Sequence, residues 1–270
     1  MQTEPFKIIT PLAPRVPILI SVPHCGVLFP DEIKNDYNQE LIKAPDDTDW
    51  FVDQLYDFAT EMGITMITAQ YSRWVIDINR DPESKPLYDD GRIITELCPT
   101  ATFAGEDIYK EGCKPNEDEV KRRITAYYNP YYTKITELLE DLKKEFGQVI
   151  FWDSHSIREY VPLIRKDKFP DLILGDNDGK TAHPSLSKSA LENLEKSGLE
   201  VRHNTPFKGG HLTRYFGQPH NNQHGLQLEM TKVNYMDDQE VNYHTQRAEK
   251  IRTMLKEVFQ GLLVKLEELK

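Results

Sequence analysis

The chain has 270 residues, 39% of them hydrophobic and 10% aromatic, and a formal net charge of −11 at pH 7. This composition supports a buried core and excludes a disordered chain. The acidic balance argues against nucleic acid or an anionic membrane as the main partner, because both attract basic surfaces. No apolar run reaches the ~20 residues of a membrane span, and residues 1–15 lack the apolar centre of a signal peptide. Three cysteines are too few for a disulfide framework, so we expect a cytoplasmic protein.

Apolar runs and helical spacing alternate along the chain. In order, they predict a strand at residues 18–22, a helix at 48–62, strands at 64–69 and 74–78, a helix at 116–146, strands at 149–152 and 172–174, a helix at 185–197, a strand at 226–230 and a helix at 241–269. Strands separated by helices favour an α/β fold with a mixed, mainly parallel sheet and helices on both faces. We expect residues 1–270 to form a single domain.

Local signals refine these elements. Thr48 is the predicted N-cap of the first helix, and Asn116 with Glu119 resembles a capping box at the start of the second. Pro130 lies inside that second helix and is expected to bend or break it. Between residues 82 and 115, prolines and glycines interrupt the chain, and apolar residues show neither helical nor strand spacing. We therefore predict a long loop insertion there, of the kind that serves as a lid or a flexible segment.

Polar residues stand at the ends of the predicted strands, where ligands bind in open α/β sheets. The candidates are His24, Asp77, Asn79, Arg80, His155 and Glu229. Any one of them alone is more often a turn or cap residue. Four such places in one chain make a shared site the stronger interpretation.

His24 lies between Pro23 and Gly26, and the rigid proline and small glycine would hold its imidazole at the strand end with room for an ion. The alternative is a histidine that is hydrogen-bonded in a loop. The neighbouring Cys25 fits a metal ligand or a nucleophile, but a buried, inert thiol is the more common role.

Three aspartates, Asp46, Asp47 and Asp49, precede the predicted helix at 48–62. Acidic residues at a helix N-terminus are stabilised by the helix dipole and by capping. Three acids in four residues exceed what a cap needs, so a carboxylate metal ligand is an equally good interpretation.

His155 stands between two serines after Asp153, and Glu229 interrupts an apolar strand. A Ser-His-Asp triad is weakly supported, because neighbours on a strand point to opposite faces. Two histidines and one carboxylate would instead leave an open zinc position for water. A charged residue on an apolar strand is costly unless it is paired or used, so Glu229 is a candidate general base; the alternative is a solvent-facing residue.

The cationic candidates are Arg73, Arg80 and Arg214, each of which alone is most simply a surface ion pair. Arg80 follows a predicted strand and could direct its planar fork at a substrate carboxylate. The glycine pair at 209–210 allows a close backbone approach or a tight turn. No Walker loop or Rossmann fingerprint follows the first strand, which argues against nucleotide hydrolysis and dinucleotide redox chemistry.

Several long motifs occur along the chain. They are Ser-Val-Pro-His-Cys-Gly at 21–26, Asp-Asp-Thr-Asp-Trp at 46–50, Tyr-Ser-Arg-Trp-Val-Ile-Asp-Ile-Asn-Arg-Asp-Pro at 71–82, Leu-Cys-Pro-Thr at 97–100, Trp-Asp-Ser-His-Ser-Ile-Arg at 152–158, Leu-Gly-Asp-Asn-Asp-Gly at 174–179, Phe-Lys-Gly-Gly-His-Leu-Thr-Arg at 207–214 and Leu-Gln-Leu-Glu-Met at 226–230. In these motifs, and over about residues 15–260, the chain resembles the N-formylglutamate amidohydrolase (N-formylglutamate deformylase) family.

The resemblance implies a fold similar to that of the zinc carboxypeptidases. In that wider group an Asn-Arg pair holds the substrate carboxylate, a late histidine binds zinc and a late glutamate is the base. Asn79 with Arg80, His155 and Glu229 occupy the matching places.

Two positions depart from the expected pattern. The carboxypeptidase ligand pair is His-x-x-Glu, but Val27 stands where the acid would be, so Asp49, or alternatively Asp47, is inferred as the second ligand. The other departure is His211, where many family members have tryptophan.

The resemblance thus implies metal-dependent hydrolysis of N-formyl-L-glutamate to L-glutamate and formate, in histidine degradation. The expected residues are His24, Asp49 and His155 for Zn²⁺ or another divalent metal, Glu229 as base, Arg73 for the oxyanion, and Asn79, Arg80, Arg214 and His211 for the small anionic amino-acid substrate. The alternatives are an amidohydrolase for a related N-acyl or N-formimino amino acid, a thiol hydrolase using Cys25, and a non-catalytic binding protein.

Overall fold

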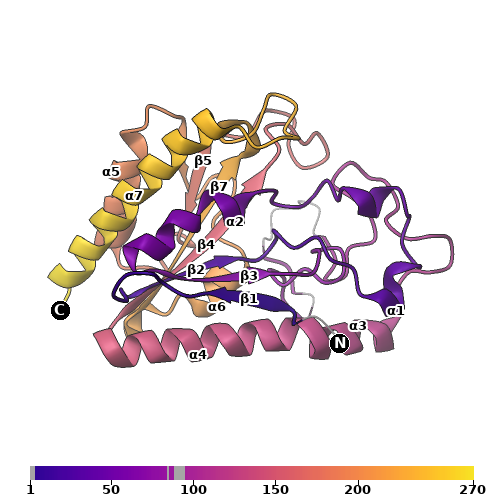
Figure 1. Ribbon diagram of the computed structural model, residues 1–270, viewed down its shortest axis with the longest axis horizontal. Coiled ribbons are helices and arrows are strands. Elements are labelled where there is room, and N and C mark those ends of the chain that lie inside the picture. The colour runs from indigo at the N-terminus through magenta and orange to yellow at the C-terminus, as the bar shows by residue number, and fades with distance from the viewer. Residues whose placement is uncertain (1–3, 84, 88–94) are drawn as a thin grey trace.

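The computed structural model of the chain describes residues 4–83, 85–87 and 95–270, which are arranged around one twisted sheet (Figure 1). The strands of these residues are β1 (Phe6–Ile9), β2 (Ile18–Val22), β3 (Thr65–Ala69), β4 (Val149–Ile157), β5 (Leu172–Gly175), β6 (Val201–His203) and β7 (Gln223–Thr231). Their order in the sheet is β1-β3-β2-β4-β7-β5-β6. The central strands β3, β2, β4 and β7 are parallel, whereas β1 and β5 are antiparallel to their inner neighbours. The predicted mixed, mainly parallel sheet is confirmed.

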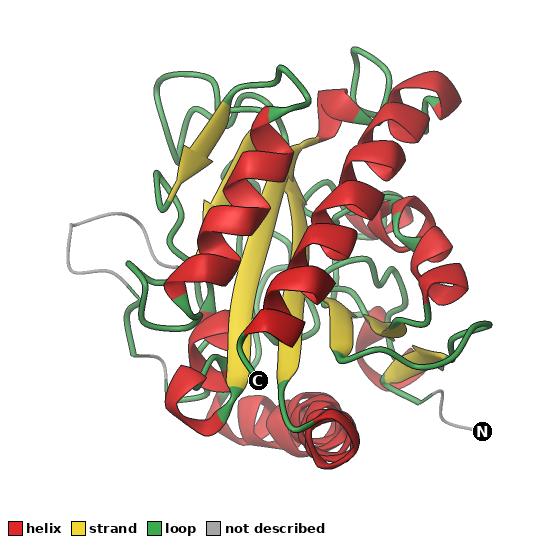
Figure 2. Ribbon diagram, turned by 90° about the vertical axis from the view of Figure 1, so that its left-hand side faces the viewer, coloured by secondary structure: helices red, strands yellow, loops and turns green. Residues whose placement is uncertain are grey.

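Helices cover both faces of the sheet. The α-helices are α1 (Asp31–Lys34), α2 (Val52–Leu55), α3 (Glu117–Arg123), α4 (Asn129–Phe146), α5 (Pro184–Glu195), α6 (His211–Phe216) and α7 (Thr245–Glu268), and single 3-10 turns lie at Leu41–Lys43, Asp57–Met62, Pro219–Asn221 and Lys232–Asn234. Figure 2 shows α5 and α7 side by side across one face. The long helix α4 lies on the opposite face.

Alternate residues of the central strands face these two helical layers, because successive strand side chains point to opposite faces. Ile150, Trp152 and Leu228 belong to the core under α2, α5 and α7. Val149 and Phe151 belong to the core under α4. Each fully buried apolar side chain of this kind stabilises the fold by about 1.5–3 kcal/mol. Beyond Phe151 the α4 side of the sheet changes from apolar to polar, and this is where the site lies.

The predicted strand at 74–78 is wrong. This segment is a buried turn, in which the backbone N–H of Trp74 donates to Ser72 Oγ at 3.2 Å and the side chain of Val75 is fully buried. The β-branched, apolar composition that predicts a strand here serves core packing instead.

The predicted helix at 48–62 is also largely wrong, because only the short helix α2 and a 3-10 turn at Asp57–Met62 form. Phe51, in the left-handed region at φ 63°, precedes α2, and the Thr48 hydroxyl has no hydrogen-bond partner in the described structure, so Thr48 is not a cap. The strands β1 and β6 escaped prediction.

The predicted interruption near Pro130 is confirmed, but as a π-helical segment, Ile124–Tyr128, that joins α3 to α4. Pro130 then lies in the first turn of α4, where its missing N–H is tolerated. Asn116 caps α3 as predicted, with its Oδ1 accepting from Glu119 N at 2.9 Å.

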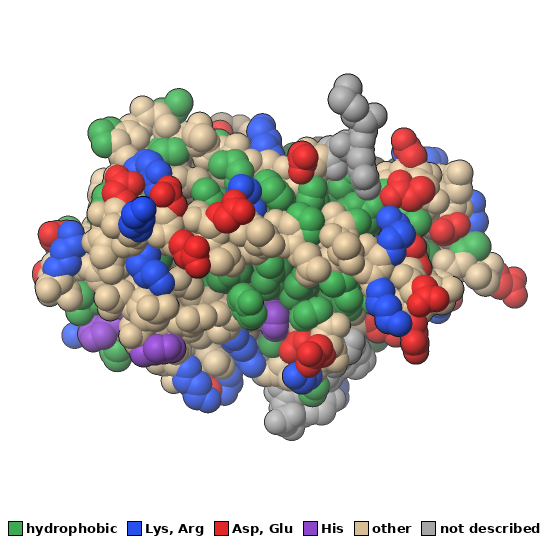
Figure 3. Space-filling model, turned by 90° about the horizontal axis from the view of Figure 1, so that it is seen from below, with side chains coloured by type: hydrophobic (Ala, Val, Ile, Leu, Met, Phe, Trp, Pro, Cys, Tyr) green, Lys and Arg blue, Asp and Glu red, His purple; other side chains and the backbone are tan. Residues whose placement is uncertain are grey.

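The described part of residues 82–115 forms isolated bridges, such as Ala101 with Asp107, and no helix or longer strand; residues 84 and 88–94 lie outside the described residues. The single domain stays a prediction. No helix of the described structure is long and apolar enough to cross a membrane. On the face drawn in Figure 3, acidic and basic side chains are interspersed, and a hydrophobic area lies near the middle.

Candidate metal centre and active site

The loop after β2 places His24 at the carboxyl end of the sheet. Gly26 lets this loop closely approach the segment that follows β3, since a Cβ on it would lie 2.3 Å from Tyr71 O. Leu28 N also donates to Gln70 O at 3.0 Å. The glycine therefore holds the loop against the neighbouring segment. The sequence had predicted that it makes room for an ion, and this role is not seen.

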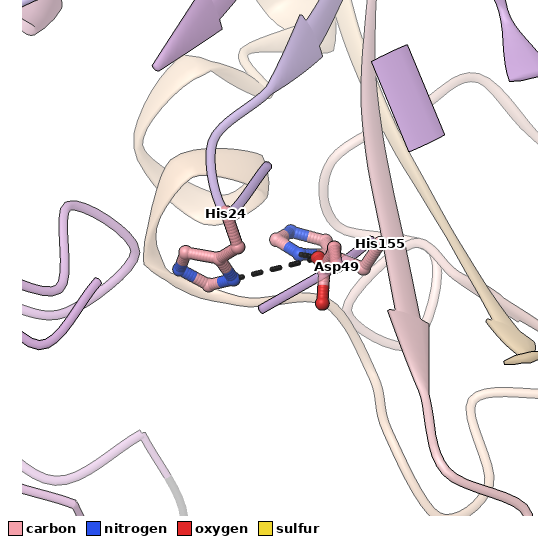
Figure 4. Close-up of side chains that lie close together, drawn as sticks. All are labelled: His24, Asp49 and His155. Atoms are coloured by element: carbon pink, nitrogen blue, oxygen red, sulfur yellow. Dashed lines mark hydrogen bonds and ion pairs between the residues drawn. The ribbon is translucent and has the colours of Figure 1, made fainter. Parts of the chain in front are cut away.

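His24 meets Asp49 and His155 in a buried cluster (Figure 4). Asp49 Oδ2 lies 3.7 Å from His24 Nδ1 and 3.2 Å from His155 Nδ1. One potential ligand atom from each residue lies within 4.8 Å of the others, and no side chain of the three is more than 4% exposed. Two imidazoles and one carboxylate are a donor set that zinc accepts.

The outer nitrogen of each imidazole has a carboxylate beside it. His24 Nε2 is 2.8 Å from Asp77 Oδ1, and His155 Nε2 is 3.1 Å from Asp153 Oδ1. The Asn79 amide also contacts His155 Nε2, at 3.0 Å. The Asp77 carboxylate in this position holds the proton of His24 on Nε2 and leaves its Nδ1 lone pair for a metal ion, whereas His155 Nε2 also faces the amide nitrogen of Asn79. The residues present therefore fit a divalent cation.

The pKa values of Asp49 and His155 also show that this cluster favours a positive charge at its centre. Burial opposes the charged form of Asp49, but hydrogen bonds from His155 and His24 hold its pKa well below the usual range. Burial likewise opposes the charged form of His155, yet Asp153 and Asp49 raise its pKa well above the ordinary value. A metal ion bound here would replace the proton that makes His155 cationic.

Glu229 lies on β7 directly opposite His155 in the parallel register with β4. It is only 9% exposed, so the interpretation as a solvent-facing residue is wrong. Burial raises the pKa of Glu229 to about 8, with repulsion from Asp49 and Asp153 adding to the effect and His155 and Arg73 opposing it. A carboxyl group with a raised pKa beside a metal cluster is typical of a general base or acid.

The three neighbouring aspartates separate into different roles. Asp46 pairs with Arg158, whose Nε donates to Oδ1 at 2.9 Å. Asp47 accepts from Trp74 Nε1 at 2.8 Å and from the backbone N–H of Phe103 at 3.0 Å. Asp47 is thus not part of the cluster, and Asp49 is the residue of the three placed to bind a metal.

The Cys25 thiol donates to two backbone carbonyls, Val22 O at 3.4 Å and Ala69 O at 3.5 Å. Burial, with Asp53 and Asp49 nearby, raises its pKa well above the usual value. Because the thiolate is the nucleophile, these surroundings argue against a thiol hydrolase.

Comparisons with known proteins identify the family. The family model described as N-formylglutamate amidohydrolase matches residues 16–236. The chain is 38% identical to an N-formylglutamate deformylase of Pseudomonas putida and 40% identical to one of Pseudomonas aeruginosa, in each case over 252 residues, 92% of this chain and 93% of the relative. The chain belongs to the N-formylglutamate amidohydrolase family.

Solved structures agree with this assignment. The crystal structure of N-formylglutamate amidohydrolase from Ralstonia eutropha JMP134 matches with a TM-score of 0.78 and 26% identity over 98% of both chains. A gene product of Agrobacterium tumefaciens, Atu2144, shares the fold with a TM-score of 0.76 at 19% identity, over 98% of this chain and 97% of that one. The predicted family is confirmed: the protein is an amidohydrolase, and hydrolysis of N-formylglutamate is the activity for which its curated relatives are named.

The amidohydrolase positions two of its arginines around Asp77. Arg73 Nη2 donates to Asp77 Oδ2 at 2.6 Å, and its guanidinium lies 4.9 Å from the centre of the Phe103 ring. Arg80 Nη2 lies 3.8 Å from the same Asp77 oxygen, while its Nε and Nη2 donate to Thr95 Oγ1 at 2.9 and 2.7 Å. Both arginines are therefore held beside the histidine cluster.

Helix α6 connects to the cluster through Asn79, whose Oδ1 accepts from Leu212 N at 2.8 Å. Gly210 allows this contact, because a Cβ there would lie 2.3 Å from the Asn79 amide. On the same helix, His211 Nδ1 lies 2.8 Å from Tyr132 Oη, and Arg214 donates from Nε to Gly209 O and from Nη1 to Leu87 O. In this structure Asn79 thus orients His155, and His211 and Arg214 lie outside the metal cluster.

Sequence reasoning did not assign roles to Asp77 and Asp153 as partners of the two imidazoles. One signal was present: Asp153 is two residues before His155, so both side chains lie on the same face of β4. The contact of Asp77 with His24 spans 53 residues and had no local signal.

Proposed function

We propose that this amidohydrolase hydrolyses N-formyl-L-glutamate to L-glutamate and formate with a divalent metal ion, zinc by its donor set, held by His24, Asp49 and His155. The observation that carries the proposal is the buried cluster of two Nδ1 atoms around one Asp49 oxygen, with a carboxylate behind each imidazole. When bound there, zinc supplies a Lewis acid that polarises a carbonyl and lowers the pKa of water toward about 7.

The residues of the chain divide the remaining work. Glu229 takes the proton of the attacking water and later gives it to the leaving amine nitrogen, a role for which its raised pKa near neutrality is suited. Arg73, buried and fixed by Asp77, stabilises the negative charge that develops on the formyl oxygen. Asp77 keeps His24 in the ligating tautomer, and Asp153 and the Asn79 amide fix the orientation of the His155 ring.

Substrate binding follows from charge. The substrate is a small dicarboxylate, and a chain of net charge −11 repels it at long range, so local cations must hold it. We assign Arg80 to a substrate carboxylate. We also assign substrate contacts to His211 and Arg214 of α6, the helix that is bound to Asn79 through Leu212 N. We also place the reaction in histidine degradation and in the reducing cytoplasm, where three unpaired cysteines are stable.

Metal analysis with turnover assays tests this function. Purified protein should carry about one zinc-type ion per chain and hydrolyse N-formylglutamate faster than N-formimino- or N-acetylglutamate. A chelator should abolish turnover and added zinc should restore it, whereas a thiol alkylating agent should have little effect. Full turnover in metal-free protein would contradict the metal role, and a preference for another acyl group would change the substrate.

A further inference from the structure

Lys232 is a buried lysine whose ammonium contacts no carboxylate among the described residues. It begins the 3-10 turn at Lys232–Asn234, directly after β7 and three residues beyond Glu229, and it is 2% exposed. Its Nζ donates to the backbone oxygen of Asp46 at 3.1 Å, and no ion pair joins it to a carboxylate among the described residues. Lysine is almost never fully buried unless it is paired, and an unpaired buried charge is costly. Such a residue calls for a functional explanation.

A cavity of about 80 Å³ lies against this lysine. It is lined, among others, by Asp46, Asp47, Phe103, Arg158, Tyr160 and Lys232. One water molecule needs about 10–15 Å³ of such volume, so a group of several heavy atoms fits. The cavity is thus large enough for a carboxylate with part of its methylene chain.

The other charged groups of this cavity already have partners. Arg158 contacts both Asp46 and Glu240, with Nη1 donating to Glu240 Oε2 at 2.9 Å. Asp47 accepts two hydrogen bonds, from Trp74 and Phe103, and burial raises its pKa. Burial lowers the pKa of Lys232, and Asp49, Asp46 and Glu240 oppose this only from a distance, so Lys232 is the cation of this cavity that lacks a direct carboxylate contact among the described residues.

The cavity also adjoins the reaction site. Phe103, which lines the cavity, lies 4.9 Å from the Arg73 guanidinium, and Lys232 contacts the backbone of Asp46, three residues before Asp49. In N-formylglutamate the α-carboxylate is close to the scissile amide, and the side-chain carboxylate is two methylene groups further away. Arg80, beside Asp77 and the imidazoles, is placed for the nearer group. The Lys232 cavity is placed for the distant one.

We propose that this cavity is the subsite for the side-chain carboxylate of the substrate, and that Lys232 is the residue that selects for it. The inference rests on the proposed function. In a buried site, a carboxylate turns an unpaired ammonium into a charge-assisted ion pair, whereas a neutral amide of the same shape leaves the charge unbalanced. Lys232 would thus discriminate glutamate from glutamine.

The test compares Lys232→Met and Lys232→Gln with Lys168→Met, an exposed lysine paired with Glu159, as the control. Wild-type protein should prefer N-formylglutamate to N-formylglutamine. Both Lys232 variants should lose about 30-fold or more in kcat/KM on N-formylglutamate and less than about 3-fold on N-formylglutamine. Lys232→Met removes a costly buried ammonium together with its hydrogen bond to Asp46 O, so its thermal midpoint should change little. The control should retain the wild-type values.

An equal loss of kcat/KM on both substrates, or a marked fall in thermal midpoint, would show a structural lysine and overturn the proposal. Equal efficiency of the wild-type protein on both substrates would also overturn it. Failure of wild-type protein to hydrolyse any N-formyl amino acid would instead contradict the proposed function. In that case calorimetric binding of L-glutamate and L-glutamine to wild type and Lys232→Met decides the subsite, and equal glutamate affinity of the two proteins overturns it.

Discussion

The paired strands β4 and β7 are buried along their whole length, yet their two halves differ in chemistry. In the amino-terminal half, Ile150 and Trp152 pack into the core beneath α5 and α7. In the carboxyl-terminal half, Asp153 pairs in register with Gln227, and His155 with Glu229. The first half excludes water by close packing, whereas the second buries groups that water would otherwise solvate.

The difference shows what the carboxyl-terminal half requires. A polar group buried without a partner costs about 1–3 kcal/mol, and a buried charge costs more. The site meets this cost with contacts from distant segments, such as Thr213 Oγ1 donating to Asp153 Oδ2 at 2.9 Å and Gly210 N donating to Gln227 at 2.6 Å. Substitutions in the two halves should therefore separate chemistry from stability.

The largest expected effect is that of His155→Ala. Removing one of three ligands should lower metal content and reduce turnover by about 10³-fold or more, because both the polarising ion and the shared Asp49 geometry are lost. Metal analysis of the purified variant and kcat measurements with excess zinc check this. Full metal content with wild-type activity would show that the cluster around Asp49 is not the metal site.

Glu229→Gln should act on the chemical step alone. The amide keeps the size of the side chain but cannot accept the proton, so kcat should fall by about 10²-fold or more while the metal is retained. Near-normal turnover would assign the base to another residue.

The same substitution has a signature in stability. Burial raises the pKa of Glu229 from 4.5 to about 8, so between these values the metal-free folded state holds a proton that the unfolded state has lost. This contribution falls as the pH rises from about 4.5 to 8. Metal-free Glu229→Gln lacks it and should gain stability relative to wild type over that range in denaturant unfolding. A constant difference from pH 4.5 to 8 would contradict the raised pKa.

How much of this contrast could be predicted depends on whether the signal is local. The strands at 18–22 and 226–230 and the cap at Asn116 were predicted well, because apolar runs and capping act within a few residues. His24, His155 and Glu229 could be singled out because polar residues at strand ends stand out against apolar runs. The family resemblance added the rest of the expected mechanism.

The remainder is decided by contacts between distant segments. Asp47 and Asp49 are equivalent in sequence, and only the positions of Trp74, Phe103 and the two histidines separate them. The segment at 74–78 has a strand composition but is fixed as a turn by buried packing. Lys232 gives no sequence signal, since a lysine after a strand is normally exposed.

Arg80→Lys is expected to have a smaller effect than either site substitution. Lysine keeps the charge but not the fork whose Nε and Nη2 contact Thr95 and whose Nη1 donates to Asn79 O at 3.1 Å. We expect the variant to lose roughly 1.5–3 kcal/mol of transition-state stabilisation, as measured from kcat/KM on N-formylglutamate. N-formylglycine should be a poor substrate of the wild-type protein. If it or N-formylmethionine were hydrolysed as well as N-formylglutamate, recognition of two carboxylates would be refuted.

Ile150→Val should have the smallest effect on turnover. Ile150 is fully buried in the amino-terminal half of β4, between Ile18 of β2 and His224 of β7. Loss of one methyl group leaves a small cavity and should cost about 0.5–1.5 kcal/mol of unfolding free energy. Because the variant leaves every polar contact of the carboxyl-terminal half in place, kcat/KM and metal content should stay at wild-type values. Chemical denaturation and turnover assays on the same preparation check both. If turnover fell about as far as in Arg80→Lys while stability was unchanged, the two halves would not be separable, and the packing of β4 would itself position the metal ligands.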